Sequence, residues 1–376
     1  MRDELALVDL EGRTKAFLEA TEIALTRRWC GGATLDTVTL DVRDPKVAEL
    51  GVANRAFKLW LDGELQFHGK LGTGQAMTSD AMNVAAPAAD PWADLTARIL
   101  GADETYTAED AGAIAIASLA AENAVGTTRL AAGSVEATVQ RTITFTAGTN
   151  RADVVTQLSQ LDGGFGFSID PVDDVPGTLA ELNIYAAMVR NSRPGVKFEF
   201  GAGTLANCSN FQEQITPPRN RVIAQGQALD DGTRPQEVAE DLASQAEYDI
   251  WPYVVSLDTT DTSVLQAHAQ AELRPEPIPV YTLTANPDAP LVCRDFDAGD
   301  VVQIAIRHGR VDVAGPMRVD SATLHRKGSV WFTDSLTLVD QGVQRVQRNP
   351  DERFYALVGS YRDRIALLER ARVVGA

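Results

Sequence analysis

The sequence predicts a mainly β protein with α+β insertions, and three observations support this fold class. Short segments rich in β-branched and aromatic residues recur along most of the chain. Turn residues separate them at short, fairly regular intervals, which is typical of barrels or sandwiches rather than of a doubly wound sheet. Candidate helices are few and connect these segments. At 376 residues the chain is long enough for two or three domains, each with its own core.

The expected strands are apolar runs bounded by Gly, Pro, Asn and Asp. Prolines surround the strand expected at residues 279–285, which favours an edge strand or an exposed lead-in over a central strand, because proline cannot donate to a sheet ladder. In chain order, we expect strands at residues 37–42, 56–61, 64–71, 137–145, 166–170, 182–189, 196–200, 221–227, 279–285, 300–306, 317–325 and 331–339.

The expected helices are identified by capping residues and apolar stripes. A helix over residues 90–99 begins with an Asp-Pro pair, residues 108–123 form an alanine-rich helix, and a third covers residues 151–161. The C-terminal helix has the clearest start, an Asn-Pro pair followed by Asp and Glu. Its apolar residues recur at spacings of three or four and form one stripe: Phe354, Leu357, Tyr361, Ile365 and Leu368.

The formal net charge of −18 argues against several classes of partner. Such an acidic chain repels nucleic acid unless a basic patch is segregated, and no dense Lys/Arg cluster occurs, so we expect no sequence-specific nucleic-acid binding. No run of about 18 apolar residues indicates a membrane span. The N-terminal residues lack the apolar core of a signal peptide, so export by that route is not expected.

The cysteines and histidines show no metal-binding spacing. Three cysteines lie far apart without a CxxC pair, which disfavours a disulfide framework or a zinc site. We interpret them as buried structural thiols. The histidines at 68, 268, 308 and 325 form no HExxH pattern, and His268 lies on a helix-like run. We expect no cofactor and no metal.

Residues 57–74 contain an apparent phosphate loop. Gly63 and Gly69-Lys70 nearly reproduce the strand-then-GxxxxGK[ST] pattern, but five residues separate the two glycines instead of four. Leu71 stands where a Ser or Thr hydroxyl should bind magnesium. The intervening residues are strand-like, whereas a phosphate cradle needs curled backbone with converging N–H groups. We therefore interpret this segment as a β-hairpin.

The hairpin turn is expected to contain three residues, 61–63. This register places Leu59 opposite Leu65 on one apolar face of the hairpin. A two-residue Asp-Gly turn would set Leu59 against Gln66 and mix apolar with polar residues on both faces. The apolar face decides the register, so the three-residue turn is favoured. His68 is then expected on the polar face, at the surface.

Two further segments were tested for ligand chemistry. Residues 201–206 match GxGxxA after a strand, but the polar, proline-containing continuation indicates a loop rather than the helix that a dinucleotide site needs. The carboxylates of Asp295, Asp297 and Asp300 lack the twelve-residue calcium-loop pattern, and a turn before a strand explains them better. No GxSxG elbow or cysteine signature is present. The sequence therefore identifies no catalytic, cofactor-binding or metal-binding residue, although a glycosidase pair of carboxylates leaves no sequence signature.

The order of these features resembles a known family. Residues 57–71 are similar to an early barrel hairpin that ends in an apolar-Gly-apolar element, and residues 151–171 to a small α/β module. Residues 196–227 resemble the entry into a second barrel, and residues 296–339 its closing strands. In this order, the motifs resemble the tail-hub, or baseplate-hub, proteins of long-tailed bacteriophages, often labelled minor tail proteins in phages of actinobacteria. The resemblance covers most of residues 20–340.

The resemblance implies a domain division and an assembly. We expect two β-barrel-like hub domains sharing a ring of pseudo-sixfold character in a homotrimer, which would bridge the sixfold tail tube to a threefold tip. The division is an N-terminal β-barrel hub domain (1–89), a helical connector (90–135), a small α/β module (136–204), a second β-barrel hub domain (205–340) and the C-terminal helix (341–376). The chain departs from the family at Tyr248-Asp249, where relatives often carry an aromatic-Gly pair. It also carries no lysozyme-like or peptidase domain, which many relatives have.

The resemblance also implies a function. We expect a structural protein of the virion tail tip, assembled in the host cytoplasm, that joins the tail tube to the host-recognition tip and forms part of the DNA channel. The expected partners are further copies of itself, the distal tail or tail-tube ring, other tail-tip proteins and the C-terminus of the tape-measure protein. The alternative is a tail-associated cell-wall hydrolase; a carbohydrate-binding module ranks last because tryptophan and tyrosine are dispersed.

Two interpretations of the C-terminal helix stay open. Its apolar stripe either packs on its own domain or contacts a neighbouring subunit or tip protein. Removal of residues 349–376 separates the two, because an unchanged oligomer would favour packing on its own domain.

Overall fold

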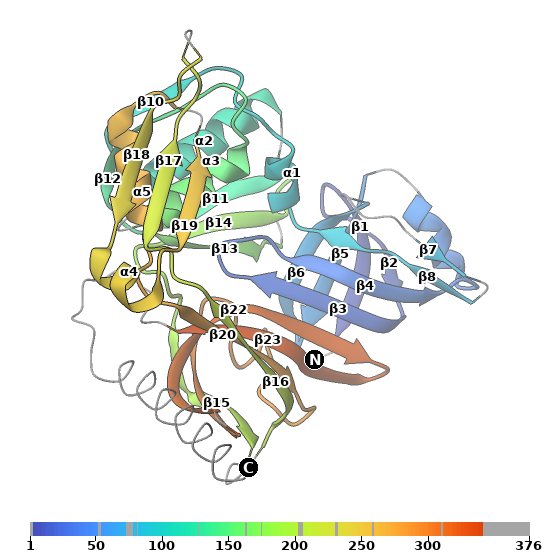
Figure 1. Ribbon diagram of the computed structural model, residues 1–376. Coiled ribbons are helices and arrows are strands. Elements are labelled where there is room, and N and C mark those ends of the chain that lie inside the picture. Colours follow the sequence, from blue (N-terminus) through green and yellow to red (C-terminus); the bar gives the residue numbers. More distant parts are fainter. Residues whose placement is uncertain are drawn as a thin grey trace, which may run out of the picture. The chain divides into compact units, whose positions relative to one another are not determined.

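The computed structural model describes residues 3–340, apart from residues 52–53, 73–77, 81, 127, 162–163, 174, 202–205, 230–231, 258 and 310 (Figure 1). Strands dominate these residues, and five α-helices and one 3-10 helix, η1 (Pro45–Gly51), interrupt them. The mainly β fold with α+β insertions is therefore confirmed. Residues 341–376, with the predicted C-terminal helix, lie outside the described part of the chain.

Fifteen strands form one large sheet, and they come from two stretches of the chain, residues 4–89 and 192–340. The strand order is β16-β20-β23-β22-β3-β4-β9-β6-β5-β1-β2, with β21 on β22, β15 on β21, β8 on β4 and β7 on β8. The strands are β1 Glu4–Asp9, β2 Thr14–Leu18, β3 Ala20–Arg28, β4 Thr34–Asp41, β5 Arg55–Leu61, β6 Glu64–Leu71, β7 Thr78–Ser79, β8 Asn83–Ala85, β9 Ala88–Ala89, β15 Ser192–Gly201, β16 Cys208–Thr216, β20 Ile278–Ala285, β21 Val301–His308, β22 Val311–Lys327 and β23 Val330–Asp340.

The large sheet is open rather than a closed barrel. Within the described residues, no ladder joins its two end strands, β16 and β2. The two stretches meet where β22 pairs antiparallel with β3, in the register Leu324 opposite Leu25. Both leucines are fully buried in one apolar core that contains residues from both stretches. At roughly 1.5–3 kcal/mol for each fully buried Leu, this shared core holds the two stretches together.

A small α/β module lies between these two stretches in the sequence. A three-stranded sheet, in the order β11-β14-β13, and a two-stranded sheet, β10-β12, pack with three helices around a second core. Asp110 and Asn150 cap the two longer helices by accepting hydrogen bonds from backbone N–H groups of the first turn. The elements are α1 Trp92–Thr96, β10 Glu104–Asp110, α2 Ala111–Val125, β11 Leu130–Val135, β12 Gln140–Phe145, α3 Arg151–Gln160, β13 Gly166–Pro171 and β14 Ala180–Tyr185.

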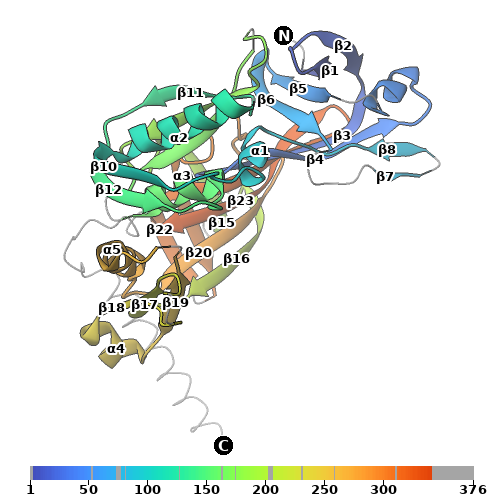
Figure 2. The same ribbon diagram turned by 90° about the horizontal axis from the view of Figure 1, so that it is seen from above.

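A second insertion forms a three-stranded sheet, in the order β18-β17-β19. Its strands are β17 (Arg221–Gln225), β18 (Gln236–Glu240) and β19 (Pro252–Ser256). Two helices belong to it, α4 (Leu242–Tyr248) and α5 (Thr262–Glu272), and Figure 2 shows α5 lying against the strands. The helix expected around His268 is therefore present as α5, whereas the sequence did not predict β18, β19 or α4.

The hairpin of β5 and β6 is confirmed, but its predicted register is wrong. The turn contains two residues, Asp62 and Gly63, both with positive φ (54° and 86°), as a tight hairpin turn requires. The register shifts by one residue between Leu65 and Phe67, so that Leu59 faces Phe67. A β-bulge at this point therefore restores the apolar pairing that the two-residue turn alone would have broken.

The predicted surface position of His68 is also wrong. The bulge turns the side chains of the residues after it to the opposite face of the hairpin from the predicted one. His68 is therefore buried, with 2% of its surface exposed. Its Nδ1 lies 2.9 Å from the carbonyl oxygen of Val172, just beyond β13. Burial lowers the pKa of His68 to about 4, so the ring is neutral at neutral pH.

Candidate functional site

The five predicted interaction residues lie outside the described residues, and their contacts stay a prediction. They are Phe354, Leu357, Tyr361, Ile365 and Leu368. The candidate sites considered below are therefore all built from residues 3–340.

The apparent phosphate loop is occupied by contacts of the protein with itself. The Lys70 ammonium pairs with the Asp94 carboxylate of α1. Gly69 lies against β9, where a Cβ would collide with the Ala89 carbonyl and the Phe67 ring. These residues form a tightly packed strand crossing rather than a cradle for phosphate. The second glycine-rich segment, residues 201–206, lies mostly outside the described residues.

Four charged residues form what we call the buried charge cluster: Arg27, Asp170, Arg190 and Asp297. Arg27 lies on β3, Asp170 on β13, Arg190 after β14, and Asp297 in the turn before β21. Arg27 Nη1 lies 2.7 Å from Asp297 Oδ2, and Arg27 Nη2 lies 3.0 Å from Asp170 Oδ1. Arg190 contacts the same two carboxylates at 2.9 and 3.2 Å. The cluster thus joins the α/β module to the large sheet through alternating charges.

The buried charge cluster has no carboxylate oxygen left for other chemistry. Asp170 Oδ2 also accepts hydrogen bonds from the Ser168 hydroxyl at 2.8 Å and the Asn183 amide at 2.9 Å. Asp297 Oδ1 accepts the Ala298 N–H at 2.8 Å. A proton or a metal at these carboxylates would compete with the arginine, hydroxyl, amide and backbone donors that already bind them. This arrangement favours a structural role over a catalytic one.

The electrostatics of Arg27 agree with this role. Burial alone lowers its pKa, but the nearby Asp297 and Asp170 charges outweigh burial and raise the pKa above its ordinary value. Arg27 therefore stays charged within a water-excluded site. Buried ion pairs cost free energy to desolvate, and they are stable only with this degree of pairing and hydrogen bonding.

Trp29 packs beside the cluster and contacts both parts that the cluster joins. Its ring leaves no room for a Cβ at Gly166 of β13 or at Gly299 in the turn before β21. It also lies against Tyr185 of β14, with ring centroids 5.4 Å apart. Gly299 has a φ of +88°, which favours glycine independently of the steric contact. Apolar packing and charge pairing thus reinforce the same junction.

The sequence analysis missed this junction, although one signal was available. Ile23, Leu25 and Arg27 alternate along β3, and the two apolar residues are fully buried. Side chains at such positions share one face of a strand, so the pattern places an arginine on the buried face. A buried arginine demands carboxylate partners. The turn expected at residues 295–300 is present and supplies one of them, Asp297, but the sequence does not reveal that pairing.

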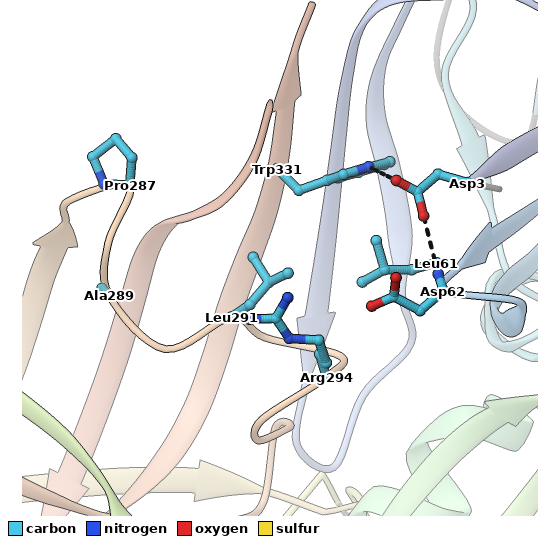
Figure 3. A pocket seen from close by; sticks show the side chains of 8 residues that line it. All are labelled: Asp3, Leu61, Asp62, Pro287, Ala289, Leu291, Arg294 and Trp331. Carbon is cyan, nitrogen blue, oxygen red and sulfur yellow. Dashed lines mark hydrogen bonds between the residues drawn. The ribbon is translucent and has the colours of Figure 1, made fainter. Parts of the chain in front are cut away.

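An open pocket of about 300 Å³ lies near the start of the chain (Figure 3). Asp3 holds two of its walls together: one carboxylate oxygen accepts the Asp62 N–H at 3.0 Å, and the other accepts the Trp331 indole N–H at 2.7 Å. Arg294, on the opposite side, hydrogen-bonds to Asp295 at 3.3 Å. Asp3 therefore links the turn after β5 to β23 through these two hydrogen bonds. The pocket offers no nucleophile and base within hydrogen-bond reach of each other, as covalent catalysis needs.

The three-stranded sheet of the second insertion, β18-β17-β19, exposes an apolar face to solvent. On the side away from α5, Val238 of β18, Ile223 of β17 and Val254 of β19 lie in one row across the sheet. Val238 is 47% exposed and Val254 is 51% exposed. We call this side the outer face. The inner face, in contrast, is buried against α5, and its core residues are Val222, Ala224, Ala239, Leu265 and Ala269.

Further exposed apolar side chains border the outer face. Leu242 of α4, Ile250 and Trp251 are all exposed, by 71%, 55% and 45%. Trp251 donates its indole N–H to the Tyr248 carbonyl at 2.6 Å, which fixes the ring at the start of β19. A cluster of exposed apolar residues of this kind is typical of a surface that binds another protein.

In the described part of the chain, no three His, Cys, Asp or Glu side chains are grouped as metal ligands. No described helix is long and apolar enough to cross a membrane. Cys208 is buried, and the thiols of Cys30 and Cys293 are partly buried. Burial raises the pKa of all three thiols to about 12, which makes them poor nucleophiles at neutral pH.

No protein-family model and no curated protein matches the sequence. Solved structures do match. The tail protein from Neisseria meningitidis MC58 is 11% identical, with a TM-score of 0.56, over 91% of this chain and 97% of that one. The 43 kDa tail protein of prophage MuSo2 from Shewanella oneidensis is 13% identical, with a TM-score of 0.57, over 91% and 99%.

A third match extends the likeness to another bacterial host. The prophage tail protein gp18 from Listeria monocytogenes EGD-e is 8% identical, with a TM-score of 0.52, over 96% of this chain and 98% of that one. All three alignments span nearly the full length of both chains, so the likeness concerns the whole arrangement of elements rather than one domain. The chain therefore has the fold of phage tail proteins, which confirms, at the level of the fold, its resemblance to the tail-hub family.

Proposed function

We propose that this chain is a structural protein of a phage tail tip, a trimeric hub that joins the tail tube to the host-recognition tip. One observation carries the proposal: tail proteins from three bacterial hosts share its fold over nearly the whole of both chains. Because the matched chains are covered to 97–99%, none of them carries a large domain that this chain lacks. Fold alone does not fix function, so the proposal also needs support from the surface of the chain.

The open large sheet supports assembly with further copies. Its end strands, β2 and β16, pair on one side only within the described residues. Free sheet edges are usually paired, covered or protected, because they offer unpaired N–H and C=O groups. A ring of copies would cover such edges. The five-part domain division, with residues 1–89 and 205–340 as hub domains, remains part of this proposal.

The charge of the chain supports a place beside the DNA path. At −18 for each copy, a trimer would repel a passing polyanion rather than bind it, which keeps the DNA mobile in the channel. A basic channel lining in an assembled ring would contradict this part of the proposal. The proposed location remains the virion. The proposed neighbours there are the tail-tube ring, other tip proteins and the C-terminus of the tape-measure protein.

The alternative, a cell-wall hydrolase, finds no support in the described residues. The buried charge cluster is saturated, and the carboxylates nearest a pocket, Asp3 and Asp62, bind backbone or indole groups or face solvent. A peptidoglycan-degradation assay with the purified chain separates the two functions. We expect no release of soluble fragments above buffer. Release that is abolished by a single carboxylate substitution would establish the hydrolase instead.

A further inference from the structure

One edge strand of the sheet β18-β17-β19 carries no charged residue. The two edge strands of this sheet are β18 and β19, since β17 lies between them. β18 reads QEVAE and carries Glu237 and Glu240, whereas β19 reads PYVVS and carries no charged residue. Charged residues are a common protection of edge strands against pairing with other chains. β19 has only Pro252, at its first position, as protection.

The backbone N–H and C=O groups of β19 are unpaired within the sheet at Val254. Leu257, just after the strand, donates its N–H to the Gln225 carbonyl of β17 at 2.8 Å. In a parallel pair, backbone groups of alternate residues point to the same side, so Tyr253 and Val255 also face β17. The N–H and C=O of Val254 therefore point away from β17. No other described strand pairs with β19 on that side.

The side chains around this edge define what could pair with it. Val254 continues the apolar row of the outer face, so the next position in the row belongs to an added strand and favours an apolar residue. At the start of β19, Glu247 and Asp249 are exposed. Arg219 stacks on Tyr253 at 3.7 Å and pairs with Glu272, and Arg221, opposite Pro252 on β17, pairs with Glu240 at 2.9 Å. The start of the edge is thus bordered by carboxylates that favour a basic partner.

We propose that the free edge of β19 binds an extended segment of a partner protein as a fourth strand, with an apolar residue beside Val254 and Lys or Arg near Asp249. Main-chain hydrogen bonds to Val254 would supply affinity, and the apolar row and the acidic end would supply specificity. The proposed occupant is a basic segment of another protein, because the exposed Glu247 and Asp249 favour a cationic residue at this end of the edge. The site is independent of the large sheet.

The test uses a synthetic peptide of alternating valine and threonine with two lysines at one end, and a matched peptide with glutamates in their place. Binding to the full chain is measured by fluorescence polarisation, up to about 1 mM of protein, since single-strand addition is weak. Hydrogen exchange of the Val254 amide is followed in parallel. We expect the lysine peptide to bind, to protect this amide and to bind at least tenfold more tightly than the glutamate peptide.

Two variants separate pairing at the edge from docking on the outer face. Val254→Pro removes the outward N–H without removing a bond to β17, so the chain should stay folded and lose at least tenfold in affinity for the lysine peptide. Val238→Lys changes the same apolar row at the other edge and should change affinity less than twofold. Equal binding by wild type and Val254→Pro, or no binding by wild type, would overturn the proposal. A change in oligomer mass on Val254→Pro would overturn the choice of occupant.

Discussion

The buried charge cluster and the outer face of the sheet β18-β17-β19 both place side chains in an unfavourable environment, but only the cluster compensates for it within the chain. The cluster removes most of the surface of two arginines and two aspartates from water, leaving side-chain exposures of 9–22%, and pairs each of them within the chain. The outer face leaves valines in water with no partner among the described residues. Both arrangements carry a cost in free energy when considered alone.

The difference indicates where each region acts. A cluster whose every carboxylate oxygen is bonded can only hold the chain together, and it does so where the α/β module meets the large sheet. A face that leaves apolar rows exposed gains stability when a partner covers it. Charged groups that are paired within the chain therefore indicate a structural region, and exposed apolar side chains without a partner indicate a surface available for assembly.

Replacement of Arg27 should have the largest effect. In Arg27→Ala, Asp170 and Asp297 lose a cation inside the protein, and an uncompensated buried charge costs about 3–5 kcal/mol. The neighbouring Arg28→Ala is the control, because Arg28 is exposed and donates hydrogen bonds to the Gly32 carbonyl and the Thr34 hydroxyl. Its cost should stay below about 1 kcal/mol. Urea unfolding midpoints measure both, and equal losses would remove the structural role of the cluster.

Asp90 provides a pH-dependent test, because it is a buried carboxylate that forms no ion pair within the described part of the chain. It accepts the N–H groups of Ala33 and Trp92, and burial raises its pKa to about 7. A folded-state pKa above the unfolded value means that the folded state holds the proton more tightly. Its contribution to stability is full below about pH 4 and is lost as the pH rises through about 7.

The Asp90→Asn variant should therefore lack this pH dependence. We expect the wild type to lose stability relative to the variant, by a few kcal/mol, between about pH 4 and pH 7. Unfolding free energies at several pH values give the difference directly, so any constant cost of the amide cancels. Parallel pH profiles for the two proteins would show that Asp90 titrates normally.

The packing of Trp29 at the junction gives an intermediate effect. Gly299→Ala combines an unfavourable positive φ with a collision against the Trp29 ring, and we expect a loss of about 2–4 kcal/mol. Gly232→Ala has a similar φ, at +80°, but has open space around it. It should cost only about 1–2 kcal/mol. Thermal unfolding that gave equal costs would show that the ring yields easily.

The two faces of the three-stranded sheet give the smallest effects. Val222→Thr places a hydroxyl in the fully buried inner face and should cost about 1–3 kcal/mol. Val238→Thr makes the same change on the outer face and should stay within about 0.5 kcal/mol. Both are read from urea midpoints. A comparable cost at Val238 would mean that the outer face is already covered in the isolated protein.

Local pattern in the sequence was sufficient to predict many elements but not their pairing. β6 begins and ends at the predicted residues 64–71, and α3 follows its predicted stripe, because both depend on side-chain periodicity. The strands β1, β2 and β3 were not predicted. β1 shows no alternation because Leu5 to Asp9 are all buried, and the buried face of β3 carries a charged residue, Arg27. The facing of His68 was wrong because a bulge, which no short-range pattern specifies, moved it.

The candidate sites depended still more on long-range contacts. The four members of the buried charge cluster lie in four segments between residues 27 and 297, and nothing local connects them. The apolar row of the outer face needs β18 and β19, two short strands whose charged or proline-containing sequences gave no signal. The family resemblance, in contrast, used the order of weak motifs along the chain. It therefore predicted the fold without predicting the contacts.

The central claim is that this chain assembles into a trimeric hub, and the mass of the purified protein in solution tests it most directly. Sedimentation velocity over a range of concentrations, in about 0.15 M salt to screen the acidic charge, gives this mass. The account predicts a species of three times the 40.4 kDa chain mass. A protein that stays monomeric, or that forms a stable dimer at every concentration, would contradict it.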